Sequence, residues 1–236
     1  VNFGQDGTFA GNKTAAGNSD GNDYGNFFHT VPSGFLALCS KNLTDCTVTP
    51  SEHFNTVLLS GNGSVRSITG VGFQPDFIWQ KKRSGTNKYG VHDALRGATL
   101  RLKFEESTAE AAHSTAITSF DSDGFSVGSD ESYNDSGQTH VYWCWKGGGE
   151  TLGTGDFTQG SIASTCNRNV AAGFSIVSYT GVGAGTVSTV GHGLSQAPNF
   201  VVLTDRNGGR KQAWHGGTAG SDWTDGMYTD GTEAAS

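Results

Sequence analysis

Residues 139–146 read Thr-His-Val-Tyr-Trp-Cys-Trp-Lys, and this stretch decides the fold class of the chain. Successive side chains of a β-strand point to opposite faces, so the valine and the two tryptophans share one face while Tyr142 and Cys144 share the other. Both faces are therefore apolar. A strand of this kind is typical of the centre of a sheet that other layers cover on both sides. The stretch predicts an all-β protein built as a sandwich.

The composition is that of short strands joined by tight turns. Glycine supplies 36 of the 236 residues and proline only 4, and no segment has the pattern of a convincing amphipathic helix. The net charge of −7 argues against a nucleic-acid partner, because nucleic acids attract clustered Lys and Arg. No stretch approaches the roughly 18 apolar residues that a membrane span requires, so we expect no membrane insertion.

The chain also contains a duplication. Residues 54–63 read Phe-Asn-Thr-Val-Leu-Leu-Ser-Gly-Asn-Gly, and residues 174–183 read Phe-Ser-Ile-Val-Ser-Tyr-Thr-Gly-Val-Gly. In each copy a proline, Pro75 or Pro198, then introduces a second apolar stretch. The offset is 174 − 54 = 120 at the start and 198 − 75 = 123 at the proline, which is the length of a domain rather than of a solenoid repeat. We therefore expect tandem antiparallel β-sandwich domains.

Runs of apolar, β-branched and aromatic residues bounded by turn residues predict the strands. The expected strands cover 55–59, 76–82, 89–93, 116–120, 125–127 and 139–146 in the first copy, and 175–180, 199–205 and 211–215 in the second. Hairpin turns are expected at 121–124 and 207–209, where glycine permits a tight turn. Residues 33–39 read Ser-Gly-Phe-Leu-Ala-Leu-Cys and indicate a further buried strand.

The four cysteines do not form a recognisable metal site. They show no C-x-x-C pair and no zinc-ligand spacing to a histidine, and three disulfide pairings are open to them: they are Cys39, Cys46, Cys144 and Cys166. Cys39 and Cys144 lie in apolar runs, where a free thiol acts as a small hydrophobic side chain. Buried free thiols are the favoured interpretation.

Catalytic motifs are weak. Residues 124–128 match the G-x-S-x-G nucleophile elbow, which requires a strand-to-helix turn, but they lie after a hairpin turn with no helix behind them. We interpret them as an ordinary strand. Glu105 and Glu106 are adjacent and would point to opposite faces of a strand, so they do not form the facing pair of a glycosidase. We expect no enzyme activity.

An acidic segment offers a candidate calcium site. Asp121, Asp123 and Asp130 lie close together in the sequence, and loops rich in oxygen ligands can bind Ca²⁺. The spacing of an EF-hand is missing, and aspartate is also a common turn residue. Calcium binding and turn formation both remain open, and no other cofactor is expected.

A second polar group follows an expected strand. His92, Asp93 and Arg96 lie at its end with Tyr89 nearby, and such side chains suit the hydroxyl groups of a sugar. The alternative is a hydrogen-bonded turn in which Arg96 binds a backbone carbonyl or Asp93. Among the five tryptophans, Trp223 lies in a polar, glycine-flanked segment and is the one expected to be exposed for ligand stacking.

Two segments resemble known protein families. The N-terminal residues Val-Asn-Phe-Gly-Gln, Phe9 and residues 34–39 look like the closing strands of a SPRY-like β-sandwich. The stretch 54–146 is similar to a domain repeated in large virion proteins of tailed bacteriophages, many of them marine. The motifs that carry this second resemblance are Gly72–Phe77, Asp93–Gly97, Thr118–Phe125 and Ser136–Lys146.

The resemblance implies a domain division and a sandwich of jelly-roll or concanavalin-like type. Residues 1–53 are expected to be the C-terminal part of a SPRY-like domain, 54–146 a first sandwich, 147–172 a glycine-rich linker, and 173–236 a second, incomplete sandwich. We expect the chain to be an internal piece of a longer polypeptide.

The function implied is that of a non-enzymatic structural and adhesion protein of a phage virion. A tail-fibre segment on the outside of the virion would present lectin-like domains to host surface polysaccharide, with other virion proteins as partners and a homotrimer as the expected assembly. One alternative is a capsid-decorating or purely structural virion protein, and a second is a polysaccharide depolymerase. An exposed aromatic and acidic groove would favour adhesion, an apolar patch would favour packing, and two convergent carboxylates would favour the enzyme.

Overall fold

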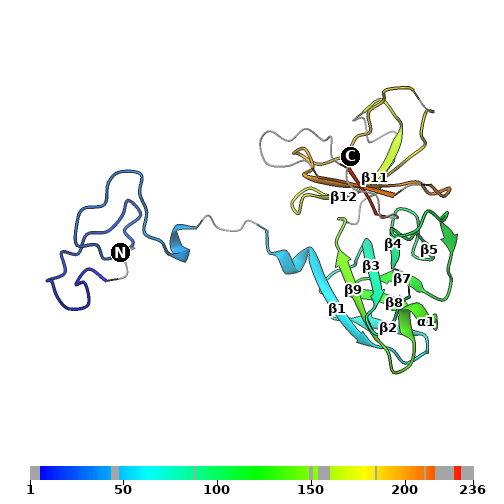
Figure 1. Ribbon diagram of the computed structural model, residues 1–236, viewed down its shortest axis with the longest axis horizontal. Helices are drawn as coiled ribbons and strands as arrows, with labels where there is room; N and C mark the ends of the chain where they lie inside the picture. Colours follow the sequence, from blue (N-terminus) through cyan, green and yellow to red (C-terminus); the bar gives the residue numbers. More distant parts are fainter. Residues whose placement is uncertain are drawn as a thin grey trace. The chain divides into compact units, whose positions relative to one another are not determined.

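The computed structural model describes residues 6–43, 48–87, 89–148, 151–153, 160–183, 185–209, 211–215 and 226–229. The chain divides into two compact units, Val1–Thr47 and Val48–Ser236 (Figure 1). Within the described parts the secondary structure is almost entirely strand, arranged in antiparallel sheets. The expectation of an all-β sandwich protein is confirmed. No helix in the described ranges is long and apolar enough to cross a membrane.

The first unit is organised around the carboxylate of Asp20. Its two oxygens accept hydrogen bonds from the backbone N–H groups of Tyr24 and Ala37, at 2.9 and 2.7 Å, and from the Asn42 side chain at 2.6 Å. Burial opposes ionisation, but these bonds outweigh it and lower the pKa of Asp20 to about 2. A single carboxylate therefore connects distant parts of this small unit.

The strand expected at 33–39 is not formed. Ala37 is buried, whereas Phe35, Leu36 and Leu38 are exposed. An extended segment becomes a strand only when a neighbour pairs with its backbone, and in residues 6–43 the one bridge joins Asn18 to Phe27. A short 3-10 turn, η1 (Ser40–Asn42), follows.

The second unit begins with the turn η2 (Pro50–Glu52) and contains a two-sheet sandwich. The larger sheet has the order β1-β9-β3-β4, with strands β1 (Phe54–Ser60), β9 (Thr139–Trp145), β3 (Phe77–Lys82) and β4 (Gly90–Asp93). The smaller has the order β2-β8-β7, with strands β2 (Arg66–Thr69), β8 (Gly124–Val127) and β7 (Ile117–Asp121). Figure 1 shows both sheets in the lower part of this unit.

β9 is the central strand that its sequence predicts. It pairs with β1 on one side and β3 on the other, so every backbone group along it can be satisfied within the sheet. Tyr142 and Cys144 are fully buried in the core between the two sheets. The residues of that core are Ile68, Val71, Phe73, Ile78, Ala116, Ile117, Phe125, Val127, Tyr133, Tyr142 and Cys144.

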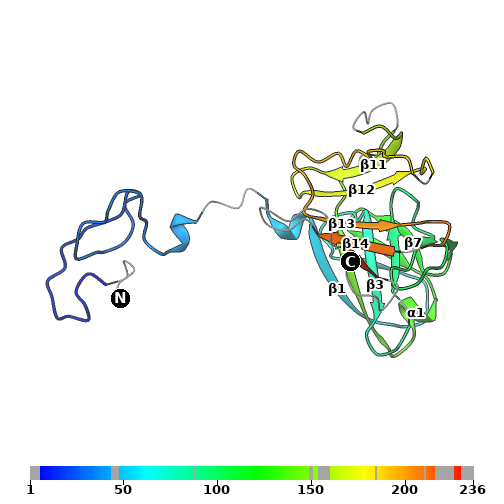
Figure 2. The ribbon, with the colours of Figure 1, turned by 45° about the horizontal axis from the view of Figure 1, so that its top comes forward.

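The opposite face of the larger sheet is covered by the second copy of the repeat. Trp145 stacks on Phe174 with ring centroids 6.1 Å apart, and Val202 packs against the cluster of Val91, Leu102 and Phe104. Figure 2 shows the strands of the second copy lying over this side of the sheet. The two copies thus share apolar contacts and belong to one compact unit.

The second copy, together with two strands that precede it, forms two three-stranded sheets. One contains β10 (Thr151–Leu152), β11 (Ser164–Asn169) and β12 (Phe174–Tyr179), and the other contains β13 (Phe200–Thr204), β14 (Lys211–His215) and β15 (Gly226–Tyr228). By the sequence repeat, β12, β13 and β14 are the counterparts of β1, β3 and β4. In the first copy β9 joins β1 to β3, whereas β12 and β13 lie in different sheets.

β11 lies inside the stretch that was expected to be a linker. Its sequence is polar, yet Cys166, Asn167 and Asn169 are buried. The side chain of Asn169 donates to the Lys146 carbonyl at 3.1 Å, and that of Asn167 lies 3.4 Å from the carboxylate of Asp76. Because hydrogen bonds rather than an apolar alternation hold this strand, the sequence pattern did not reveal it.

The prediction of buried free thiols is confirmed for Cys144 and Cys166 and is only partly met by Cys39. Cys144 and Cys166 are buried free thiols, and burial raises the pKa of Cys144 to about 12. Cys39 is a free thiol that is only half-buried. Cys46 lies outside the described residues.

Candidate functional site

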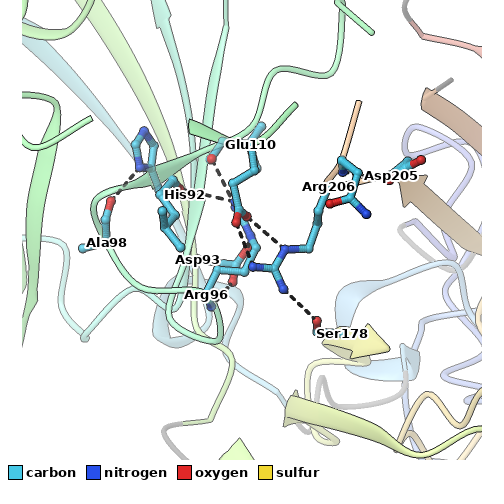
Figure 3. Close-up of polar contacts among 11 residues, drawn as sticks. His92, Asp93, Arg96, Ala98, Glu110, Ser178, Asp205 and Arg206 are labelled. Atoms are coloured by element: carbon cyan, nitrogen blue, oxygen red, sulfur yellow. Dashed lines mark hydrogen bonds and ion pairs between the residues drawn. The ribbon is translucent and has the colours of Figure 1, made fainter. Parts of the chain in front are cut away.

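The polar group at the end of β4 is brought together as the sequence suggested (Figure 3), but its side chains are buried. The side chains of Asp93 and Arg96 are each only 5% exposed, and Arg96 Nε binds Asp93 Oδ2 at 2.6 Å. Arg96 also donates to the backbone carbonyls of Val91 and Leu100, at 3.2 and 3.4 Å. The interpretation of a hydrogen-bonded turn is confirmed.

His92 is completely buried in this turn, with both ring nitrogens engaged. Its Nδ1 lies 2.6 Å from the Ala98 carbonyl, which can only accept, so Nδ1 carries the proton. Nε2 then accepts from the hydroxyl of Tyr133 at 2.7 Å. Burial lowers the pKa of His92 to about 3, so the imidazole is neutral at physiological pH.

The same cluster connects the two copies of the repeat. Glu110 accepts from Arg96 at 2.8 Å and from Arg206, just after β13, at 2.7 Å. Arg206 in turn lies 3.4 Å from the Ser178 hydroxyl on β12 (Figure 3). The arrangement accounts for His92, Asp93 and Arg96 as parts of the scaffold.

Tyr89 lies just before β4, apart from this cluster. Its backbone N–H donates to Glu105 at 2.5 Å, and its ring packs edge-on against Trp79 with centroids 5.9 Å apart. The Lys81 ammonium lies 5.5 Å from the ring centroid. Trp223, the other expected stacking residue, lies outside the described residues.

The acidic candidates also have partners within the protein. Asp121 accepts from the hydroxyls of Ser119 and Ser126, each at 2.8 Å. Asp123 accepts from the backbone N–H groups of Gly70 and Gly72, which lower its pKa. In the described part of the chain, no three His, Cys, Asp or Glu side chains are placed to share a metal ion.

Residues 124–127 form the ordinary strand β8 and Gly128 follows it, which confirms that interpretation. A Cβ at Gly124 would lie 1.9 Å from the Ile68 carbonyl oxygen, and one at Gly128 would lie 2.2 Å from that of Thr115. Both glycines are thus required by close approach of the backbone. Ser126 donates to Asp121 and has no histidine partner among the described contacts.

Asp130, unlike the other two aspartates, lines a polar pocket of about 430 Å³ that opens to solvent. The pocket lies beside the short helix α1 (Glu131–Asn134) and the two-stranded sheet of β5 (Leu100–Arg101) and β6 (Ala111–Ala112). Its lining residues are Thr86, Asn87, Arg101, Lys103, His113, Asp130 and Ser132. We take this pocket as the candidate functional site.

Hydrogen bonds hold the wall of the pocket that α1 forms. Asp130 caps the helix by accepting from the Ser132 N–H at 2.8 Å, and the Gln80 side chain donates to the Ser132 carbonyl at 2.6 Å. Tyr133 and Asn134 are fully buried, and Asn134 donates to the carbonyls of Ser64 and Gly128, at 2.7 and 2.9 Å. A wall anchored in this way is preorganised for a ligand.

The other walls present side chains by strand alternation. Leu102 is buried and bridges to Val91, so Arg101 and Lys103 on either side of it point away from that core. His113 follows β6 and approaches Asp130, with Nδ1 and Oδ2 3.2 Å apart. Asn87 donates to the Ser132 hydroxyl at 3.1 Å and so adjoins the α1 wall.

Comparison with known proteins places the larger unit in a family. One sequence family, described as a domain of unknown function (DUF7483), matches residues 49–236. The chain belongs to the DUF7483 family. No curated protein matches the chain, and no solved structure matches it. The DUF7483 match begins within two residues of Val48, where the second compact unit starts, and it contains the whole pocket.

Most of the pocket in this DUF7483 domain was missed by the sequence reasoning, which named only Asp130. One signal was present: Arg101, Leu102 and Lys103 place two cations on one face of a strand whose other face is apolar. The other contributors come from separate loops, and only the folded chain brings them together.

Proposed function

We propose that the chain is a non-enzymatic adhesion element of a phage virion that binds host surface polysaccharide through the pocket beside α1. The observation that carries this proposal is an open pocket lined by side-chain donors and acceptors on a preorganised wall. Sugar hydroxyls both donate and accept hydrogen bonds. The side chains of Thr86, Asn87 and Ser132, together with the charged groups around them, offer such hydroxyls both donors and acceptors.

Binding rather than hydrolysis is supported by the carboxylates at this site. A glycosidase uses two carboxyl groups facing each other across the substrate. Asp130 is the one carboxylate among the lining residues, and it is engaged as a helix cap and as a partner of His113. We therefore assign no reaction to the pocket.

The virion location and a trimeric assembly are part of the same proposal and rest on the resemblance of the motifs to phage virion domains. Single sugar sites bind weakly. Several copies in one fibre would raise the effective concentration without any new contact, which is how a shallow polar pocket could still attach a particle to a cell.

A second candidate function, packing against other virion proteins, is favoured by the first unit. Several of its large apolar side chains are exposed, namely Phe9, Phe35, Leu36, Leu38 and Leu43. Exposed apolar patches commonly mark interfaces. The two functions are compatible, because these residues and the pocket belong to different units.

Retention on immobilised bacterial surface polysaccharides tests the proposed function. We expect the chain to be retained, relative to a blank matrix, without releasing new reducing ends. Released reducing ends would identify a depolymerase instead, and failure to bind any polysaccharide would leave the packing function. Repeating the measurement with calcium and with a chelator tests the acidic segment: a chelator-sensitive retention would restore calcium as a ligand.

A further inference from the structure

The pocket beside α1 carries an excess of positive charge in an acidic protein. Arg101 and Lys103 both line it, whereas the whole chain has a net charge of −7. Burial and the nearby Arg101 lower the pKa of His113, while Asp130 opposes that shift. His113 is therefore mainly neutral at pH 7, and the fixed charges lining the pocket are two cations and one carboxylate.

The two cations differ in how far they are neutralised. Lys103 forms an ion pair with Glu106 at 2.7 Å. No carboxylate of the described chain forms an ion pair with Arg101, and its positive charge counteracts the rise that burial causes in the pKa of the nearby Tyr133 hydroxyl. That hydroxyl is held by His92 at 2.7 Å. Arg101 therefore lines the pocket without a carboxylate partner that would neutralise its charge.

The guanidinium group suits an anion in particular. Its planar array of N–H donors matches the two oxygens of a carboxylate or the oxygens of a sulfate or phosphate. Asn87 and Ser132 supply neutral partners in the same pocket. Asp130 is the one lining group that would repel such a ligand.

We propose that the pocket selects acidic polysaccharide, and that Arg101 binds the anionic substituent of the sugar while Asn87 and Ser132 contact its hydroxyl groups. This inference rests on the proposed function and goes beyond it by naming the ligand class and the residue that recognises it. Carboxylate, sulfate and phosphate substituents share the required chemistry.

The first test is affinity for polygalacturonate, dextran sulfate and neutral dextran, measured with the full chain at low salt. We expect binding to one or both acidic polymers and much weaker binding to dextran. Arg101→Gln should weaken acidic-polymer binding about tenfold or more, because a charge-assisted hydrogen bond to an ion is lost. Arg83→Gln is the matched control, since Arg83 is exposed, lies outside the pocket lining and carries the same charge.

A second variant should change affinity in the opposite direction. Asp130→Asn keeps an effective helix cap, because asparagine caps as well as aspartate does, but removes the negative charge from the lining. Binding of the acidic polymer should tighten about threefold or more. A merely structural disturbance at the pocket would weaken binding in both variants, so the opposite signs identify an electrostatic site.

Galacturonate monomer provides a readout that does not depend on adhesion. Its titration should shift the imidazole NMR signals of His113 in the unmodified chain and not in Arg101→Gln. If the chain is retained on polysaccharide but Arg101→Gln and Arg83→Gln behave alike, or dextran binds as well as the acidic polymers, this inference is wrong while the proposed function stands. If galacturonate shifts His113 but no polymer is retained, the proposed function is wrong and the anion site remains.

Discussion

His92 shows how one buried residue can make stability depend on pH. It is fully enclosed between the Ala98 carbonyl and the Tyr133 hydroxyl, and burial lowers its pKa to about 3. An unfolded histidine titrates near 6.5. Because the unfolded chain binds the proton more readily, the stability that neutral His92 contributes is complete above about pH 6.5 and is lost as the pH falls toward 3.

Unfolding by urea at a series of pH values measures this effect. Between about pH 6 and 4 the free energy of unfolding should fall by about 1.4 kcal/mol per pH unit on account of His92. His92→Gln should be less stable at neutral pH but should show a shallower fall. His29→Gln, in the first unit, is the control and should keep the full slope. Equal slopes in the original chain and in His92→Gln would refute this account.

At the scale of an element, the β7–β8 hairpin depends on close backbone contact as well as on the packing of its buried side chains. Gly124 opens β8 and pairs with Thr69 of β2, where the Ile68 carbonyl leaves no room for a Cβ. Asp123 in the turn holds the loop after β2 through Gly70 and Gly72. The Thr118–Phe125 motif is thus explained as the joint between the strands of the smaller sheet.

Gly124→Ala should therefore separate β8 from β2. We expect it to lower the free energy of unfolding by about 2 kcal/mol or more, since the clash is with backbone that cannot move without loss of pairing. Gly181→Ala is a suitable comparison, because nothing lies within 4 Å of its added Cβ. Thermal unfolding of the two variants gives the measurement, and equal melting temperatures would contradict the steric argument.

At the scale of the whole molecule, the second unit is one body because its two copies share contacts on the outer face of the larger sheet. Phe174 and Val202 supply the apolar part of this contact, and Glu110 supplies the polar part by binding Arg96 and Arg206. Burial raises the pKa of Glu110, but the hydrogen bonds from both arginines outweigh burial and the net shift is downward. The carboxylate is therefore ionised at neutral pH.

The ion pairs that Glu110 forms with Arg96 and with Arg206 should contribute differently to the free energy of unfolding. Glu110→Gln should cost about 2–3 kcal/mol of stability, because the side chain of Arg96 is almost fully buried and would keep only Asp93 as an ionic partner. Arg206→Gln should cost less than about 1 kcal/mol, since its side chain is 45% exposed. Chemical denaturation of the single and double variants tests this ranking, and a larger loss in Arg206→Gln would overturn it.

Much of the strand framework could be predicted from local pattern. All nine expected strands of the two copies are present, with ends that differ by no more than a residue. Alternation predicts them because every second side chain along β9 or β3 must enter a core. The strand expected at 33–39 failed because an apolar run indicates burial, whereas a strand also needs a paired neighbour.

The sequence by itself determined the all-β class, the duplication and the central position of residues 139–146, and it offered the turn made by Asp93 and Arg96 as one of two interpretations. Each of these follows from neighbours in the chain or from strand alternation. Only the tertiary structure decided that polar β11 is a buried strand, that the two copies form one body, and that Arg101, His113 and Asp130 meet at one pocket. Those features depend on contacts between residues far apart in the chain, and the local periodicity of a sequence does not indicate such contacts.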